Sequence, residues 1–448
     1  MRKGLFGTDG IRGEANRWPM DVESISRVGA AAGSLFLKTS GPHRAVIGKD
    51  TRLSSYMVEQ ALTAGLLSVG ANVFLFGPIP TPAVGMLTSS LRADVGFMIS
   101  ASHNPFHDNG IKMFGPDGFK ISPAEQDQIE HLTAGAYSQA RAEPRAIGRA
   151  KRIEDAQARY IEYVKATFPK EVSLTGLRIV VDCANGAAYE VAPAALWELG
   201  AEIIEIGTEP NGFNINDKCG STAPERLCSK VRQVRADLGI AFDGDADRVI
   251  FADEKGKVVD GDQLIGLIAR KWQQSGQLRG RQIVTTVMSN LGLERYLKGI
   301  GLKAARTPVG DRHIINHMRK HNLNVGGEQS GHIVLLDYGT TGDALVAALQ
   351  LLALIVNDQK PVSEICHLFD PLPQISRNVT LANGEAPDQP AIRKLIDGLE
   401  ARLKGEGRLL IRKSGTEPCV RIMAEGEDEA LIAEIAEEAA AALLKKVA

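Results

Sequence analysis

One strand–helix–strand unit occurs three times along this chain of 448 residues. Each copy begins with a short β-branched run, continues with a helical stretch that ends at a glycine, and closes with a second apolar run. The copies cover residues 43–77, 176–207 and 280–308. The predicted helix stops are Gly70, Gly200 and Gly301. Strands that alternate with helices are typical of parallel sheets covered on both faces. We therefore predict three similar α/β domains, because a single core stops growing at ~250–300 residues.

A further apolar strand follows each copy, and each of these strands ends in an unusual polar loop. The strands are predicted at Val95–Ile99, Leu238–Phe242 and Leu323–Val325. The loops after them contain SASHNP, DGDADR and GGEQSGH. Ligands of open α/β sheets bind beyond the carboxyl ends of the strands. Three equivalent strand ends are thus expected to carry three different sets of chemical groups.

The last ~80 residues follow another pattern. The segment Pro371–Pro373 predicts a boundary, strands are expected at Leu409–Arg412 and Cys419–Met423, and a helix is expected from about Asp428. The predicted fold class is α/β, with three similar α/β domains of mixed or parallel sheets and a smaller C-terminal α+β domain around a central cleft. The predicted domain limits are residues 1–152, 153–252, 253–368 and 369–448.

Charge, hydropathy and cysteine usage exclude several classes of protein. The chain has 52 Lys and Arg against 54 Asp and Glu, so it has no overall attraction to nucleic acid or to a membrane surface. The longest apolar stretch, Ala344–Val356, is too short to span a bilayer and predicts a buried helix. No apolar leader follows Met1, and the five cysteines form no CxxC pair. We expect a reduced cytoplasmic protein without a zinc site or a disulfide framework.

The DGDADR loop places Asp243, Asp245 and Asp247 at alternate positions of one turn. Three carboxylates held together repel one another unless a cation neutralises them, and ligands that are all oxygen suit Mg²⁺. A solvated acidic turn is one alternative. A calcium loop of the EF-hand type is another, but Arg248 stands at the sixth position, where that loop needs glycine.

The SASHNP loop offers Ser102 as a nucleophile beside His103. An ordinary polar turn is the plain alternative. A Ser–His hydrolase needs a triad and an oxyanion hole, and the chain has no GxSxG motif. A serine close to a magnesium loop favours phosphoryl chemistry instead. Lys112 then supplies a cation to the transferring oxygens, unless it is a surface lysine.

Two further loops carry groups suited to a phosphorylated sugar. In GGEQSGH, Glu328 and Ser330 suit hydroxyl groups, and His332 is either a proton carrier or a structural histidine. The stretch RKSGTEPCVR predicts an anion cradle or a charged hairpin. The members of this predicted cradle are Arg412, Ser414, Gly415, Thr416 and Arg421. Near the first strand ends, Arg12 and Arg52 either face a phosphate or form structural salt bridges.

Five motifs in order give the chain its resemblance to the α-D-phosphohexomutase superfamily: GTDGIRG, SASHNP, DGDADR, GEQSGH and RKSGTEP. The resemblance covers the whole chain and implies four domains around a cleft. It implies a phosphoserine at Ser102, with Mg²⁺ held by its phosphate and by the three aspartates of DGDADR. It also implies sugar contacts from Glu328 and Ser330, and a phosphate cradle at Arg412 and residues 414–416. Arg248, Val309 and Gly310 are further expected substrate contacts.

The motifs TPVGDR, at residues 307–312, and NINDKCGS, at residues 214–221, resemble the amino-sugar branch of this superfamily, as does Gln329. That resemblance implies interconversion of glucosamine 6-phosphate and glucosamine 1-phosphate through a phosphoserine and a 1,6-bisphosphate. The product would feed UDP-N-acetylglucosamine synthesis. Lys112, His103 and His332 all remain candidates for the proton carrier, and Arg12 would help to neutralise the phosphoryl group. A homodimer is also expected from resemblance.

Three alternatives stay open at this point. The chain could be a phosphomannomutase/phosphoglucomutase with another sugar preference. It could be a magnesium-dependent sugar phosphatase that uses the same serine. It could be a sugar-phosphate-binding protein without activity, although binding alone needs no nucleophile.

Overall fold

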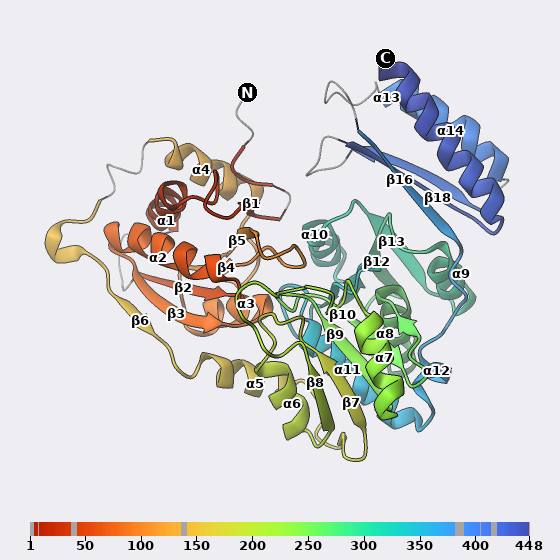
Figure 1. Cartoon of the computed structure of the whole chain (residues 1–448), viewed down its shortest axis with the longest axis horizontal. Coiled ribbons are helices and arrows are strands. Elements are labelled where there is room, and N and C mark those ends of the chain that lie inside the picture. Colours follow the sequence, from red (N-terminus) through yellow and green to blue (C-terminus); the bar gives the residue numbers. More distant parts are fainter. Residues whose placement is uncertain are drawn as a thin grey trace.

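The computed structural model describes residues 4–7, 9–36, 43–135, 141–380, 389–403, 405–413 and 419–447. These residues form four sheets, each the centre of one domain, and we number the domains I to IV in chain order (Figure 1). The α/β class with a smaller fourth domain is confirmed.

Domain I is built on a six-stranded sheet of order β1-β5-β4-β2-β3-β6. Its elements are β1 (Ile11–Glu14), α1 (Val22–Phe36), β2 (Arg44–Lys49), α2 (Leu53–Ser68), β3 (Asn72–Pro78), α3 (Thr81–Ser90), β4 (Val95–Ile99), β5 (Asp108–Phe114), α4 (Pro123–Thr133) and β6 (Ala150–Arg152). A Ser122–Glu125 capping box starts α4.

Domain II contains a five-stranded sheet of order β11-β10-β9-β7-β8. Its elements are α5 (Ala156–Ala166), β7 (Arg178–Asp182), α6 (Val191–Glu198), β8 (Glu202–Ile206), α7 (Glu225–Val234), β9 (Leu238–Phe242), β10 (Val249–Asp253) and β11 (Val258–Val259).

Domain III contains a four-stranded sheet of order β13-β12-β14-β15. Its elements are α8 (Gly261–Ser275), β12 (Gln282–Thr286), α9 (Leu291–Gly299), β13 (Lys303–Thr307), α10 (Asp311–His321), β14 (Val325–Gly327), β15 (Ile333–Leu335), α11 (Ala344–Asp358) and α12 (Val362–Ile365). The apolar stretch predicted as a buried helix is α11, and the Asp343 side chain caps it by accepting from the Val346 N–H at 2.9 Å.

The three α/β domains share one strand order, which confirms the repeat. Within the larger sheets the recurring orders are β3-β2-β4-β5, β8-β7-β9-β10 and β13-β12-β14-β15. The predicted helix stops Gly70, Gly200 and Gly301 all have positive φ, at 91°, 100° and 74°, where glycine carries no steric cost.

Of the mixed or parallel sheets that were predicted, the structure has mixed ones, because the last strand of each repeat is antiparallel. β5 pairs antiparallel with β4, β10 with β9, and β15 with β14. The polar loops that precede these strands are too short to hold a crossover helix, so the chain can only turn back along its neighbour.

The third polar-loop strand also begins later than predicted. The sequence suggested residues 323–325, whereas β14 covers Val325–Gly327. A Cβ on Gly326 would lie 2.7 Å from the Met318 sulfur, and one on Gly327 would lie 2.4 Å from the His332 carbonyl oxygen. Both glycines therefore allow close packing inside a strand, although glycine usually indicates a loop.

Domain IV has a hydrophobic core of its own, whereas one large apolar cluster runs through domains I, II and III. Its elements are β16 (Gln374–Thr380), α13 (Gln389–Glu400), β17 (Arg408–Lys413), β18 (Cys419–Glu425) and α14 (Glu429–Val447), with strand order β16-β18-β17. The two helices pack against its three strands at one end of the molecule (Figure 1). The predicted C-terminal strands and helix are thus confirmed within a residue or two.

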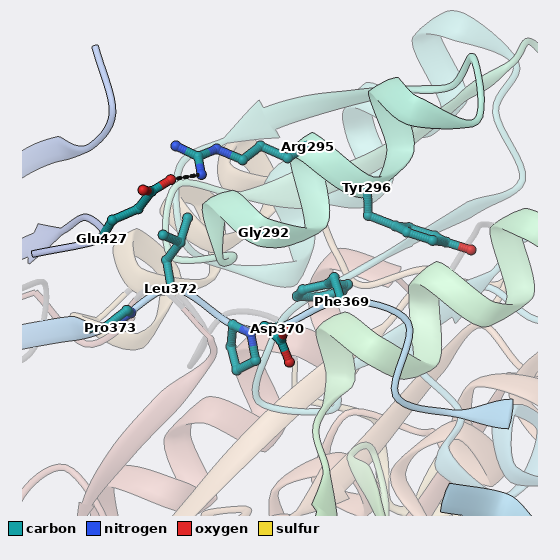
Figure 2. Close-up of a pocket in the computed structure, with 9 residues that line it drawn as sticks. Gly292, Arg295, Tyr296, Phe369, Asp370, Leu372, Pro373 and Glu427 are labelled. Carbon is teal, nitrogen blue, oxygen red and sulfur yellow. Dashed lines mark hydrogen bonds and ion pairs between the residues drawn. The ribbon is translucent and has the colours of Figure 1, made fainter. Parts of the chain in front are cut away.

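A cavity of about 420 Å³ lies where domain III meets domain IV. Figure 2 shows Arg295 on α9 pointing across it to Glu427, and the two side chains form an ion pair of 2.6 Å. Phe369, Pro371 and Pro373 of the connecting segment line the other side. None of the residues that line this cavity belongs to the predicted site.

Among the described residues, no helix is both long and apolar enough to cross a membrane. The five cysteines are all buried, and none of them forms a disulfide.

Candidate active site

The loops after β4 and β9 meet, although they belong to different domains. Ser102 Oγ donates a hydrogen bond of 2.6 Å to Asp243 Oδ2, across 141 residues of sequence. Both side chains are buried. The backbone carbonyl of Asp245 also accepts a 2.9 Å hydrogen bond from the N–H of Thr81, at the start of α3. The strand-end arrangement predicted from the repeat therefore brings the serine to the first aspartate.

Ser102 has a left-handed backbone, with φ +52°, which is uncommon for any residue other than glycine. Its N–H donates to Ser100 Oγ at 2.9 Å, and its Oγ lies 3.3 Å from His103 Nδ1. Burial, and then the charges of Arg248 and Arg12, lower the pKa of His103 to about 4. His103 is therefore neutral near pH 7 and can accept a proton.

The three aspartates form a compact set of oxygen ligands. One carboxylate oxygen from each of Asp243, Asp245 and Asp247 lies within 4.8 Å of the others, and all three residues are buried. Asp245 Oδ1 and Asp247 Oδ1 have no hydrogen-bond partner. Burial, together with the charges of Asp247 and Asp245, raises the pKa of Asp243 to about 8. Unpaired buried oxygens and mutual repulsion are what a divalent cation would relieve, so this donor set fits one.

Lys112 crosses from β5 to the same carboxylates. Its Nζ donates to Asp245 Oδ2 and to Asp247 Oδ2, each at 2.8 Å, and lies 3.6 Å from Asp9 Oδ2. Burial opposes its charge, but Asp245 and Asp247 outweigh that effect and raise the pKa of Lys112 well above its ordinary value. The surface-lysine alternative is therefore wrong. Arg12 donates to Asp9 Oδ2 at 2.8 Å and to the Ala101 carbonyl at 3.1 Å. Its guanidinium therefore lies at the loop of residues 100–107 that carries Ser102, which we call the serine loop.

A ring of alternating charges joins three domains around this cluster. From Lys112 it continues through Asp9 to Lys120, then to Asp311 at 2.6 Å, and then to His332. His332 Nδ1 lies 3.7 Å from Asp247 Oδ1, which closes the ring. Burial opposes the charge of His332, but Asp247, Asp311 and Glu328 raise its pKa above the ordinary value.

Sequence reasoning missed several members of this arrangement. Asp9 and Asp311 lie inside motifs that were singled out, GTDGIRG and TPVGDR, so a signal existed for both. Lys120 and Thr81 had none, since each makes its contact across a domain boundary. Thr81 Oγ1 donates to Asp245 Oδ2, in addition to the backbone bond already described.

The third loop, after β14, holds a carboxylate and a hydroxyl side by side. Glu328 Oε1 accepts from the Gly310 N–H at 3.1 Å, and Ser330 Oγ donates to Glu328 Oε2 at 3.2 Å. Glu328 is half-buried and Ser330 is exposed, as is needed for contact with a ligand. Val309 is half-buried beside Gly310.

Gln329 points away from this pair, because its Nε2 donates to Asp260 Oδ2 at 3.3 Å. The Nε of Arg248 lies 3.9 Å from Asp247 Oδ1 and has no hydrogen-bond partner among the described residues.

The predicted phosphate cradle is described only in part. Ser414, Gly415 and Thr416 lie outside the described residues. Arg412 and Arg421 stand opposite each other on β17 and β18. Burial and then the charge of Arg421 lower the pKa of Arg412, while Glu328 of domain III acts in the opposite sense. Two like charges in register are unfavourable without an anion between them.

Comparison with known families covers all four domains. The chain matches the phosphoglucomutase/phosphomannomutase family in all four of its domains. The α/β/α domains I, II and III match residues 3–140, 158–256 and 260–372, and the C-terminal domain matches residues 377–442. The chain belongs to this family. It is therefore an isomerase of the phosphohexomutase type, as the resemblance implied.

Relatives and solved structures narrow the branch. The chain is 62% identical over 443 residues to a phosphoglucosamine mutase of Parvibaculum lavamentivorans, with 99% of each chain covered. It is 58% identical over the full length of both chains to one of Methylobacterium nodulans. The predicted placement in the amino-sugar branch of the phosphohexomutases is thus confirmed.

Two solved structures share the fold. A phosphoglucomutase/phosphomannomutase family protein of Burkholderia thailandensis has a TM-score of 0.81 at 25% identity, covering 99% of this chain and 97% of that one. An N-acetylphosphoglucosamine mutase of Aspergillus fumigatus, solved with GlcNAc-6P and magnesium, has a TM-score of 0.70 at 18% identity, covering 99% and 96%.

Proposed function

We propose that this enzyme interconverts glucosamine 6-phosphate and glucosamine 1-phosphate through a phosphorylated Ser102 and a 1,6-bisphosphate intermediate. The observation that carries the proposal is the 2.6 Å hydrogen bond from Ser102 Oγ to Asp243 Oδ2, within a set of three buried aspartates. A nucleophile beside a cation site is the arrangement that phosphoryl transfer requires. The names of the relatives supply the amino sugar.

The reaction consists of two phosphoryl transfers, each between Ser102 Oγ and one oxygen of the sugar, first O1 and then O6. The phosphoryl group leaves Ser102 Oγ for O1 of glucosamine 6-phosphate, so one P–O bond breaks as another forms, and the proton that the sugar hydroxyl loses ends on Ser102 Oγ. The 1,6-bisphosphate then turns over, and its 6-phosphoryl group returns to Ser102 Oγ. Each transfer depends mainly on positioning and on neutralisation of charge.

We assign a resident Mg²⁺ to Asp243, Asp245, Asp247 and the Ser102 phosphate. When bound, it supplies positive charge to the phosphoryl oxygens and orients them. Lys112 and Arg12 neutralise the remaining charge from the domain I side. His103 is the proton carrier nearest to Ser102 Oγ, at 3.3 Å. His332 is the second candidate proton carrier, and its Nδ1 lies 3.7 Å from Asp247 Oδ1.

The two ends of the sugar phosphate are held by different domains. Glu328 and Ser330 contact the sugar hydroxyls, with Arg248, Val309 and Gly310 around them. The distal phosphate binds between Arg412 and Arg421, with the loop at residues 414–416 completing the cradle. A fixed cradle can hold either phosphate, so the intermediate can present both of its ends to Ser102 in turn.

Location, assembly and domain limits follow the same proposal. Five buried cysteines, none of them in a disulfide, support a cytoplasmic location, where thiols stay reduced. The product would enter UDP-N-acetylglucosamine synthesis. A hexose 1,6-bisphosphate would serve as activator, and a homodimer is the proposed assembly. The domain limits at residues 152 and 368 stay as predicted, whereas the limit predicted at residue 252 moves to residue 259, because β10 and β11 complete the sheet of domain II.

The proposal is tested with purified enzyme, Mg²⁺ and a trace of hexose 1,6-bisphosphate. We expect a larger kcat/KM for glucosamine 6-phosphate than for glucose 1-phosphate or mannose 1-phosphate, and intact mass should show one phosphate on Ser102. Ser102→Ala should abolish turnover, and Asp245→Asn should weaken activation by Mg²⁺. Release of free phosphate without isomerisation would indicate the phosphatase instead. Equal turnover of the neutral sugar phosphates would be consistent with the same mechanism but would show that the enzyme is not specific for the amino sugar.

A further inference from the structure

Two side chains from different domains hold the serine loop, and both donate hydrogen bonds to the carbonyl groups of Ser102 and Asn104. Arg52 Nη2 donates to the Ser102 carbonyl at 3.1 Å and also to the Asn104 carbonyl. Asn216 Nδ2 donates to the same two oxygens, at 2.9 Å and 3.0 Å. Arg52 follows β2 of domain I, and Asn216 lies in the loop between β8 and α7 of domain II.

We propose that Arg52 and Asn216 are positioning residues that hold Ser102 in its left-handed conformation and fix its Oγ against the metal-binding loop. The inference rests on the proposed role of Ser102 as the nucleophile. It assigns no contact with substrate to either residue.

The conformation of Ser102 needs such support. A residue other than glycine at φ +52° has a higher free energy than one in the right-handed helical or extended regions, so contacts with the surrounding structure must stabilise this conformation. The Ser102 carbonyl accepts from both side chains, and the Ser102 N–H is fixed by Ser100 Oγ. Both backbone polar groups of Ser102 are therefore held, which fixes its Cα–Cβ bond in a position from which Oγ reaches Asp243 Oδ2 at 2.6 Å.

Arg52 is itself immobile. It is fully buried, it forms an ion pair with Asp50, and its Nη1 lies 3.4 Å from Ser100 Oγ. Asp50 in turn accepts from the Arg52 N–H and from Ser55 Oγ, both at 2.9 Å. The salt-bridge alternative for Arg52 is thus confirmed, and the same guanidinium still has donors left for the serine loop.

Asn216 brings domain II to the same point. Its N–H donates to the Ala184 carbonyl at 2.9 Å, which fixes its backbone. Gly244, the second residue of DGDADR, makes room: a Cβ there would lie 2.6 Å from the Ser102 carbonyl oxygen and 2.8 Å from Asn216 Nδ2. Asn216 and Asp243 belong to domain II, so the hydrogen bonds from Asn216 set the position of Ser102 relative to the three aspartates of the acidic loop.

The test compares Asn216→Gly with Asn214→Ala in the full-length enzyme. Asn216 has φ +59°, which glycine adopts without strain, so the first variant removes only the side chain. Asn214 is the matched control, because its side chain donates to the Glu209 carbonyl at 2.9 Å in the same loop and, among the described residues, forms no hydrogen bond with the loop that carries Ser102. Steady-state kinetics give kcat and KM, and intact mass gives the rate at which hexose 1,6-bisphosphate phosphorylates Ser102.

We expect Asn216→Gly to lower kcat and the phosphorylation rate together by roughly 10- to 100-fold, with KM for the sugar phosphate unchanged, because displaced reacting atoms cost about that much. Asn214→Ala should stay near the parent enzyme. The proposal is overturned if Asn216→Gly keeps its kcat while Ser102→Ala is inactive, or if both asparagine variants fall equally. Activity in Ser102→Ala would overturn the proposed function instead.

Discussion

Glu425 is the carboxylate on which the attachment of domain IV depends. It is completely buried, and its Oε1 accepts from the Leu291 N–H of domain III at 2.7 Å and from Gln374 Nε2 at 3.0 Å. Its Oε2 pairs with Arg408. Arg408 also donates to the carbonyls of Val287 and Ser289, each at 2.6 Å. Because Arg408 begins β17, this junction orients the strand that ends at the predicted phosphate cradle.

Glu425→Gln keeps the shape of the side chain but removes its charge and sets an amide NH₂ against Arg408. Hydrogen bonds to a charged group contribute about 1.5–3 kcal/mol, and removing one partner of a buried ion pair costs about 3–5 kcal/mol. The glutamine retains one oxygen for Leu291, so we expect a loss of about 2–3 kcal/mol in the docking of domain IV. The undocked population should then rise roughly 30- to 150-fold.

Hydrogen exchange measured by mass spectrometry can follow this change. Peptides that contain Leu291 and β17 should exchange faster in Glu425→Gln, and KM for the sugar phosphate should rise. Glu437→Gln is the control, since Glu437 pairs with Arg377 at 2.7 Å within domain IV but both side chains are exposed. Exposed pairs contribute little, so exchange at the junction should not change there. Equal exchange in the two variants would refute the reasoning.

Further predictions concern the other charged groups. Burial, and then the Asp260 charge, raise the pKa of Asp262 to about 7. Because this folded pKa lies above the unfolded one, the stabilisation is present below about pH 4 and is lost as the pH rises to 7. Asp262→Asn should therefore melt at a higher temperature than the parent at pH 8 and at nearly the same temperature at pH 4; a difference independent of pH would contradict the pKa. Arg412→Ala should raise KM more than it lowers kcat, and an unchanged KM would remove Arg412 from the cradle. Lys120→Met should lower kcat by releasing Asp9 and Asp311, whereas Lys120→Arg should restore part of it.

The sequence predicted what is local and repeated. The helix stops at Gly70 and Gly200 follow from one residue and its φ, and Val95–Ile99 and Leu238–Phe242 were predicted to the residue. The serine and the acidic loop could be found because each is a short motif at a strand end. Their meeting across two domains was implied by the family resemblance and not by the strand pattern, because the two strands belong to different sheets.

Contacts between domains could not be predicted in this way. Thr81 reaches Asp245 across 164 residues, and Lys120 reaches Asp311 across 191. Neither pair has a spacing or periodicity that would reveal it, because the contact depends on how finished domains pack. Gly326 and Gly327 misled for the opposite reason: their local preference suggests a loop, but neighbouring side chains and backbone require them inside a strand.

The separation between the serine and its partners also affects synthesis of the protein. A ribosome finishes Ser102 114 residues before Asn216 and 141 residues before Asp243. At roughly 10 residues per second, the nascent chain carries the serine for more than about ten seconds without either partner. Its loop then lacks the hydrogen bonds from Asn216, and its hydroxyl has no carboxylate to meet. Truncated chains that stop within domain II would not be phosphorylated by hexose bisphosphates. Phosphate on Ser102 would therefore be found only on chains whose first two domains are complete and packed together.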